Sequence, residues 1–135
     1  MSGDPESVVT QFVAAFAAID SEAMSQLVDV DVVAHITNAE GGADRVEGRQ
    51  ALMDRIGAVD YGAATLTIEV TNTISPAPGQ ALAMAEVRAT APSGERLHNF
   101  AGHLCTVVDG WITEWWMVEA LPAESDRFWA AVTAG

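Results

Sequence analysis

The amino-acid sequence predicts a single α+β domain, spanning residues 1–135, in which helices pack on one curved antiparallel sheet. Three observations support this class. A helical pattern opens the chain, strand-like segments dominate its second half, and helical spacing returns after Pro122. The 135 residues, 50% of them hydrophobic, are enough to build one buried core. Grouped strands flanked by helices favour an α+β architecture over alternating parallel units.

Four helices are expected. Asp4 can cap the first helix, and Pro5 suits its first turn. Asp20 or Ser21 starts a second, shorter helix. A third helix is expected over 49–57 and a last one from Pro122 onward. The apolar stripe of the first helix consists of Val8, Val9, Phe12, Val13, Phe16 and Ile19.

Five strands are expected, over residues 31–37, 64–74, 81–90, 97–108 and 111–119. Residues 38–48 contain Gly41-Gly42 and alternating charges, which predicts a loop or an irregular hairpin. Asp109-Gly110 is a strong signal for a two-residue turn joining the last two strands.

That turn would pair Val108 with Trp111, and therefore Leu104 with Trp115 and Phe100 with Glu119. Neither face of the predicted hairpin is purely polar, so we expect helices to cover one face and a second subunit the other. One face would hold His98, Phe100, Leu104, Thr106, Trp111, Thr113, Trp115, Met117 and Glu119. The other would hold Asn99, Ala101, His103, Cys105, Val107, Ile112, Glu114, Trp116 and Val118.

Composition excludes several classes of function. The net charge of −13 argues against binding nucleic acid or an anionic membrane surface. The chain has no lysine, which rules out Schiff-base chemistry, a lysine-held pyridoxal cofactor and a P-loop. The lone Cys105 excludes an internal disulfide. With no leader pattern at residues 1–5 and no run of membrane-spanning length, we expect a cytoplasmic protein.

We also expect neither a metal nor a cofactor. The three histidines, His35, His98 and His103, show no ligand spacing such as a pair four residues apart on one helix.

Several local patterns resemble the nuclear transport factor 2-like superfamily, which includes ketosteroid isomerase, limonene epoxide hydrolase and the SnoaL-type polyketide cyclases. The matching segments are the helix 9–19, the strand segment Asp31-Val32-Val33-Ala34-His35, and residues 46–52 leading into the third helix. The most specific is Asp109-Gly110-Trp111-Ile112-Thr113-Glu114-Trp115, which is similar to the family's "DGxIxxW" hairpin. The resemblance implies a cone-shaped α+β barrel with a pocket under the helices, and dimers formed through the outer face.

Matching the isomerase residues one by one argues against that mechanism. The resemblance places Phe12 at the family's tyrosine, Ile36 at its aspartate base and Leu104 at its protonated acid. None of these side chains can move a proton or donate a hydrogen bond. The epoxide hydrolase tryptophan matches Trp115, but the carboxylate expected two residues later is Met117. The cyclases' acidic group near the end of the last strand has a loose counterpart in Glu119.

Glu119 is therefore the main catalytic candidate, since an apolar pocket would raise its pKa toward neutrality; the alternative is a solvated carboxylate at the end of the strand, on the rim. His98 is a possible helper on the same predicted face, and the alternative for His98 is a surface position at a strand start. Asn38 either points into the pocket or stabilises a loop. The residues expected to line the pocket are Phe12, Phe16, Ile36, Asn38, Leu104, Trp115 and Met117.

The direction of Glu86 and Arg88 depends on a strand register that the sequence leaves open. On the outer face, His103, Trp116 and Val118 are the predicted interface of a symmetric homodimer. Three hypotheses for function follow. The first is a cofactor-independent cyclase, isomerase or hydrolase acting on an apolar small molecule; the second is a non-catalytic binding module for such a ligand; the third is a purely structural dimer.

Overall fold

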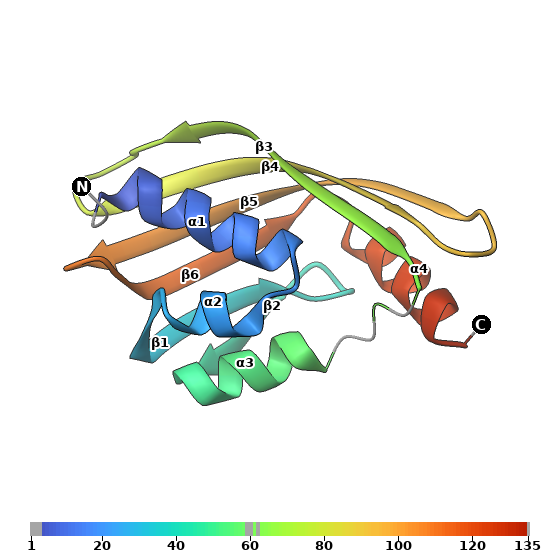
Figure 1. Ribbon diagram of the computed structural model, residues 1–135, viewed down its shortest axis with the longest axis horizontal. Helices are drawn as coiled ribbons and strands as arrows, with labels where there is room; N and C mark the ends of the chain where they lie inside the picture. Colours follow the sequence, from blue (N-terminus) through green and yellow to red (C-terminus); the bar gives the residue numbers. More distant parts are fainter. Residues whose placement is uncertain (1–3, 59–60, 62, 135) are drawn as a thin grey trace.

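The computed structural model describes residues 4–58, 61 and 63–134 (Figure 1). Residues 1–3, where the sequence was considered for a leader, lie outside the described part. The elements in chain order are α1 (Pro5–Ala17), α2 (Ser21–Ser25), β1 (Val28–Thr37), β2 (Ala43–Glu47), α3 (Arg49–Gly57), β3 (Thr65–Ile74), β4 (Gln80–Thr90), β5 (Arg96–Val108), β6 (Trp111–Glu119) and α4 (Pro122–Ala134). The predicted α+β class is confirmed.

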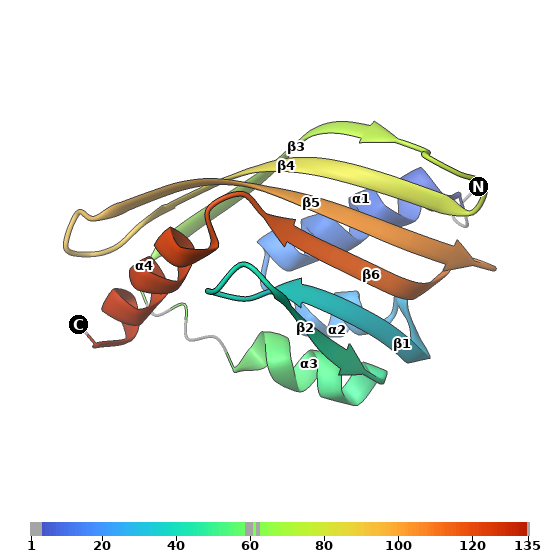
Figure 2. The same ribbon diagram turned by 180° about the vertical axis from the view of Figure 1, so that it is seen from behind.

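Six strands form one strongly curved, open sheet in the order β2-β1-β6-β5-β4-β3 (Figure 2). Residues 38–48 form a hairpin whose second arm is β2. Four of the five pairings are antiparallel, whereas β1 and β6 run parallel. The sheet is therefore mixed, because β6 pairs with β1 across a long connection rather than through a tight turn.

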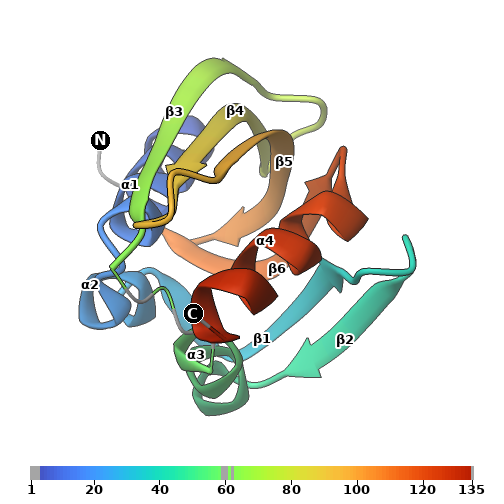
Figure 3. The ribbon, with the colours of Figure 1, turned by 90° about the vertical axis from the view of Figure 1, so that its right-hand side faces the viewer.

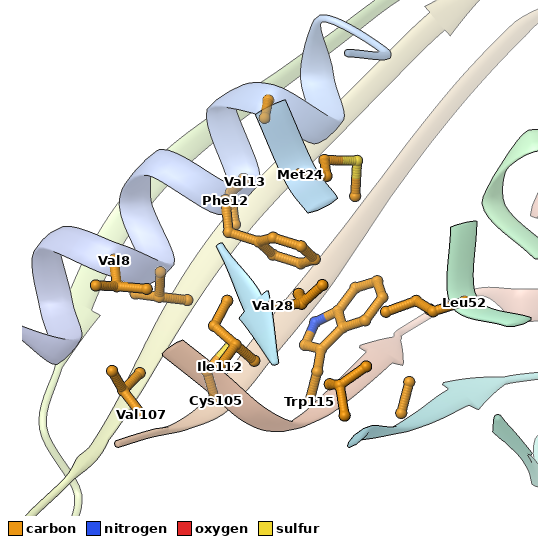
Figure 4. Close-up of a cluster of buried hydrophobic side chains, with 14 of the residues drawn as sticks. Val8, Phe12, Val13, Met24, Val28, Leu52, Cys105, Val107, Ile112 and Trp115 are labelled. Carbon is orange, nitrogen blue, oxygen red and sulfur yellow. The ribbon is translucent and has the colours of Figure 1, made fainter. Parts of the chain in front are cut away.

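Helices α1, α2 and α3 cover the concave face of the sheet (Figure 3). Helix α1 begins as predicted, with the carboxylate of Asp4 accepting a hydrogen bond from the backbone N–H of Ser7 at 3.2 Å and Pro5 in the first turn. Its apolar stripe packs on β3, β4 and β5. The prediction is wrong for Ile19, which lies beyond the end of the helix and is 46% exposed. Phe12 is fully buried, and its ring meets the indole of Trp115 edge-on at 4.9 Å (Figure 4). This contact joins the first helix to the last strand at the centre of the core.

The β5–β6 hairpin differs from the prediction beyond its turn. Asp109 and Gly110 both have positive φ, as the predicted two-residue turn requires, and Val108 pairs with Trp111. The register then shifts, because Val107 pairs with Ile112 but Thr106 pairs with Glu114. Thr113 is the extra residue of a β-bulge. Every later residue of β6 therefore pairs with a residue of β5 one position away from the partner that the sequence predicted.

Because of the bulge, the second half of β6 shares each face of the sheet with the opposite set of β5 side chains from the one predicted. Trp115 pairs with Cys105 instead of Leu104, and Glu119 pairs with Ala101 instead of Phe100. The concave face therefore combines Trp115, Met117 and Glu119 with the other set of β5 side chains, namely Asn99, Ala101, His103 and Cys105. This change determines which polar groups can reach a ligand.

None of the helices in the described part of the chain is long and apolar enough to cross a membrane.

Candidate functional site

A cavity of about 480 Å³ opens between the concave face of the sheet and helices α3 and α4. Helix α4 lies across the open end of the curved sheet (Figure 3). The wall is mainly apolar and aromatic, as is usual for small-molecule sites. It is lined by Phe16, Ile36, Thr37, Asn38, Ala39, Glu40, Asp44, Arg55, Ile56, Tyr61, Leu66, Ile68, Val87, Leu97, Ala101, His103, Trp115, Met117, Glu119, Pro122, Ser125, Asp126 and Trp129.

Most of the side chains predicted for the pocket line this cavity, and two do not. Phe16, Ile36, Asn38, Trp115 and Met117 belong to its wall, together with the catalytic candidate Glu119. Phe12 is packed in the core beneath Trp115 and does not line the cavity. The placement of Leu104 is wrong, because the bulge pairs it with Trp116 on the convex face.

Glu119 lies at the end of β6 and is fixed by a buried amide. The Nδ2 of Asn99 donates a hydrogen bond to Glu119 Oε1 at 3.1 Å, and Asn99 has no exposed surface. The Oδ1 of Asn99 accepts hydrogen bonds from the backbone N–H groups of Phe100 and Leu121, at 2.8 and 2.9 Å. Because Oδ1 is occupied by two donors, the amide can present only its NH₂ group to Glu119.

Burial raises the pKa of Glu119 above its usual value of 4.5, and a hydrogen bond from Ser125 on α4 partly opposes this rise. Ser125 is itself buried, at 8% exposure. The same environment affects Tyr61, whose pKa is raised by burial and by the charge of Glu119. Glu119 is thus a carboxyl group shifted toward the pH range in which it can both take and give a proton.

His103 is the second polar group of the inner wall, although the sequence placed it at the interface. That placement is wrong, since His103 is 3% exposed and lines the cavity. The indole Nε1–H of Trp115 donates a hydrogen bond to His103 Nδ1 at 3.3 Å, and the planes of the two rings are nearly parallel, at 8°. Burial lowers the pKa of His103 to about 4. The imidazole is therefore neutral at pH 7, with its proton on Nε2 because Nδ1 accepts a hydrogen bond.

The predicted partnership of His98 with Glu119 is also wrong. His98 pairs with Arg88 across β4 and β5 on the convex face. Its Nε2 lies 2.6 Å from Glu86 Oε2, and Arg88 lies 2.9 Å from the same oxygen. The register that the sequence left open thus directs Glu86 and Arg88 away from the cavity, where they form an ion-paired surface cluster with His98.

At the mouth of the cavity, Asn38 stabilises the β1–β2 turn. Its Oδ1 accepts hydrogen bonds from the backbone N–H groups of Glu40 and Gly42, at 3.2 and 3.0 Å. Its Nδ2 donates to Asp44 at 3.1 Å, and Arg55 pairs with the other oxygen of Asp44 at 3.0 Å. The hydrogen bond from Asn38, and then Arg55, lower the pKa of Asp44. Asn38 therefore stabilises a loop, which was one of its two predicted roles, and it also borders the cavity.

The convex face carries the remaining interface candidates. Trp116 stacks on His35 with a centroid separation of 5.2 Å, and His35 Nε2 lies 2.8 Å from Glu114. Val118 is 58% exposed, and Phe100 nearby on β5 is 46% exposed. Within the described ranges, no group of three or more His, Cys, Asp or Glu side chains is arranged to hold a metal ion.

Sequence reasoning missed Asn99 and His103 because it assumed an unbroken hairpin. The signal that could have found them is the spacing of Ile112 and Trp115. Both are fully buried, yet they lie three residues apart, which strict alternation forbids on one face. The polar pair Thr113-Glu114 between them marks the bulge.

Comparisons with known proteins agree with this fold. Residues 9–115 match the family model of the SnoaL-like domain. The structure of Bal32a from a soil-derived mobile gene cassette superimposes with a TM-score of 0.77 at 17% identity, covering 96% of this chain and 99% of that one. A polyketide cyclase-like protein of Xanthomonas campestris pv. campestris gives 0.73 at 20% identity, covering 98% and 99%. A ketosteroid isomerase-like protein of Catenulispora acidiphila gives 0.68 at 17% identity, covering 84% and 85%. No curated protein matches the sequence significantly.

Proposed function

The chain belongs to the SnoaL-like domain family, and we propose that it is a cofactor-independent enzyme of the cyclase, isomerase or hydrolase type with Glu119 as its acid–base residue. The observation that carries the proposal is the Glu119 carboxyl itself. It faces a largely apolar cavity, burial raises its pKa, and the fully buried Asn99 fixes its orientation. A carboxyl that is desolvated and also held in one geometry suits proton transfer better than it suits stability.

His103 supplies the complementary group. Its cross-strand partner is Met117, and Glu119 pairs with Ala101, so His103 and Glu119 are diagonal neighbours on the concave face, about 7–8 Å apart by sheet geometry. Ala101, opposite Glu119, and Met117, opposite His103, are the neighbouring side chains on that face. A ligand carbonyl placed there can accept a hydrogen bond from Nε2–H while Glu119 removes a proton from the adjacent carbon.

In that step the C–H bond breaks, its proton passes to a Glu119 carboxylate oxygen, and the electron pair moves onto the carbonyl oxygen as an enolate. The neutral imidazole donates to the developing oxyanion without giving up its proton. Returning the proton from Glu119 to a different carbon of the enolate system completes an isomerisation. Attack of the enolate on a second carbonyl of the same molecule forms a C–C bond, and transfer of the Glu119 proton to the resulting alkoxide oxygen completes a cyclisation. A ligand that fills the cavity displaces water from its apolar lining, which strengthens both interactions.

Exchange of the α-hydrogens of ketones for deuterium tests this chemistry without knowledge of the natural substrate. Aryl and alicyclic ketones of increasing size are incubated with the protein in D₂O and followed by proton NMR. We expect catalysed exchange that Glu119→Gln reduces about a hundredfold or more, in line with the loss of a positioned base. Glu114→Gln is the matched control, because Glu114 lies on the same strand but faces His35 on the convex side. Unchanged exchange in Glu119→Gln would refute the assignment.

A non-catalytic binding module is the second candidate, favoured because Phe12 and Ile36 stand where the resemblance to ketosteroid isomerase implies a tyrosine and an aspartate base. Native mass spectrometry showing a retained apolar ligand, combined with no exchange by either wild type or Glu119→Gln, would select this candidate. The cavity of about 480 Å³ argues against a purely structural role.

We further propose that the protein is a homodimer formed through the convex face. Val118 and Phe100 place exposed apolar surface there beside the half-buried Trp116, with His103 no longer part of the predicted interface. Light scattering at micromolar concentration should give twice the monomer mass of 14.2 kDa. Val118→Arg should give the monomer mass, and Ile74→Arg, at a comparably exposed apolar position on the edge strand β3, should leave the dimer intact.

A further inference from the structure

The charged groups around the cavity indicate which ligands can enter it. Four carboxylates border the cavity, from Glu40, Asp44, Glu119 and Asp126, against the single guanidinium of Arg55. Arg55 is already paired with Asp44 at 3.0 Å, and the lowered pKa of Asp44 keeps that pair ionised. Glu40 and Asp126 are exposed, and no ion pair involving either is seen among the described residues.

These two carboxylates belong to different elements that flank the opening. Glu40 lies in the β1–β2 turn and Asp126 in the second turn of α4. Figures 1 and 2 show this turn on the same side of the molecule as α4. The turn is held by Asn38, whose Oδ1 binds the backbone N–H of Glu40 itself at 3.2 Å. The backbone that carries Glu40 is therefore held in one conformation at the mouth.

A separate observation inside the cavity, on His103, indicates which group the ligand carries at its inner end. His103 is 97% buried, since its exposure is 3%, and Nδ1 is occupied by Trp115. Nε2–H has no partner among the residues that the structure describes, and His103 lines the cavity, so a hydrogen-bond donor is available for a ligand acceptor. The wall of the same cavity also carries the aromatic rings of Phe16, Tyr61 and Trp129. Aromatic faces attract cations as well as apolar groups.

We propose that the cavity selects molecules with three parts: a carbonyl-type acceptor at the His103 end, an apolar or aromatic body, and a positively charged nitrogen at the mouth beside Glu40 and Asp126. Anionic ligands of the same shape are rejected. The overall charge of −13 acts in the same direction, since it raises the local concentration of cations and lowers that of anions. This inference rests on the proposed function for the orientation of the ligand, but its test requires only binding.

Three probes vary the charge at one position: 4-(trimethylammonio)acetophenone, 4-tert-butylacetophenone and 4-acetylbenzoate. They share the acetyl group and the ring; the trimethylammonio and tert-butyl groups have the same shape and differ in charge, and the smaller, planar carboxylate supplies the anion. Titrations followed by protein NMR should give affinity in the order cation, neutral, anion. We expect about a fivefold step between successive probes at low salt, because exposed charges contribute modestly. High salt should reduce the differences in affinity between the three probes, because it screens exposed charges.

The double substitution Glu40→Gln and Asp126→Asn should reduce the preference for the cationic probe to about twofold or less, while the affinity for the neutral probe stays unchanged. Glu22→Gln combined with Glu124→Gln is the matched control, because it removes the same net charge from exposed positions that do not line this cavity. This control should retain the full preference. Equal binding of the three probes, no binding of the cationic probe at millimolar concentration, or an unaltered preference in the mouth variant would each overturn the inference.

The outcome is independent of the catalytic assignment. Neither Glu40 nor Asp126 takes part in the proposed proton transfer, so the charge preference and the exchange reaction test different residues. Loss of exchange in Glu119→Gln with no charge preference would leave the proposed function intact and remove this inference. A clear charge preference without any catalysed exchange would support this inference and refute the proposed function.

Discussion

Replacing Asn99 by leucine should be among the most costly single changes in the chain. Leucine has nearly the same size but removes three hydrogen bonds: those from the N–H groups of Phe100 and Leu121, and the one to Glu119. An unpaired buried N–H group costs about 1–3 kcal/mol, and the lost hydrogen bond to a charged group is of similar size. Cavity water can reach Glu119, which is only partly buried, so the two backbone groups dominate the cost.

Burial of the leucine side chain offsets about 1–2 kcal/mol of that loss. The free energy of unfolding should therefore fall by about 3 kcal/mol, a large part of the total of about 5–15 kcal/mol expected for a domain of this kind. Urea denaturation at pH 7, followed by tryptophan fluorescence, measures the change, and an unchanged m-value would show that the native fold is kept.

Asn99→Asp is the informative companion variant. Its side-chain oxygens can still accept from both backbone N–H groups, but a second carboxylate then meets Glu119 Oε1 where the amide NH₂ stood, 3.1 Å away. Repulsion between the two carboxylates should make this variant less stable at pH 7 and restore much of the loss in acid, when the pair shares a proton. An Asn99→Leu variant within about 1 kcal/mol of wild type would refute the reasoning, since it would mean that the backbone groups find other partners.

The remaining predictions concern the titrating groups of the cavity. Because the pKa of Glu119 is raised, its contribution to folding is favourable below the unfolded value of 4.5 and is lost as pH rises through the folded pKa. Glu119→Gln should therefore be more stable than wild type at neutral pH and lose that advantage in acid, as followed by thermal unfolding across pH. The pKa of His103 is lowered from 6.5 to about 4. Its contribution to the free energy of unfolding is therefore present above pH 6.5 and is lost as the pH falls toward 4, by up to about 3 kcal/mol. Wild type should lose more stability between pH 6.5 and 4 than His103→Gln. Nitrogen-15 NMR should show His103 as the Nε2–H tautomer at pH 7, and Trp115→Phe should remove this tautomer preference, whereas retention of the preference would argue against the indole hydrogen bond. Burial raises the pKa of Cys105 to about 12, so the native protein should react with iodoacetamide only as fast as it unfolds, measured by mass spectrometry in native buffer and in urea.

The sequence alone determined the class of the fold, because the signals for its elements are local. The apolar stripe of α1, the cap at Asp4 and the turn at Asp109-Gly110 each depend on neighbouring residues, and all three are present in the structure. The direction of Glu119 and Trp115 toward the cavity also followed from alternation along a single strand.

Only the tertiary structure decided which residues of β5 accompany Glu119 and Trp115. A strand side chain has two possible directions, and a single inserted residue reverses the choice for all that follow. The bulge at Thr113 moved His98 and Leu104 to the convex face and brought Asn99 and His103 to the concave one. The residues at the mouth of the cavity could not be predicted from the sequence either. Glu40 and Asp126 belong to elements far apart in the sequence, and both border the cavity only because the sheet curves and α4 lies across its end.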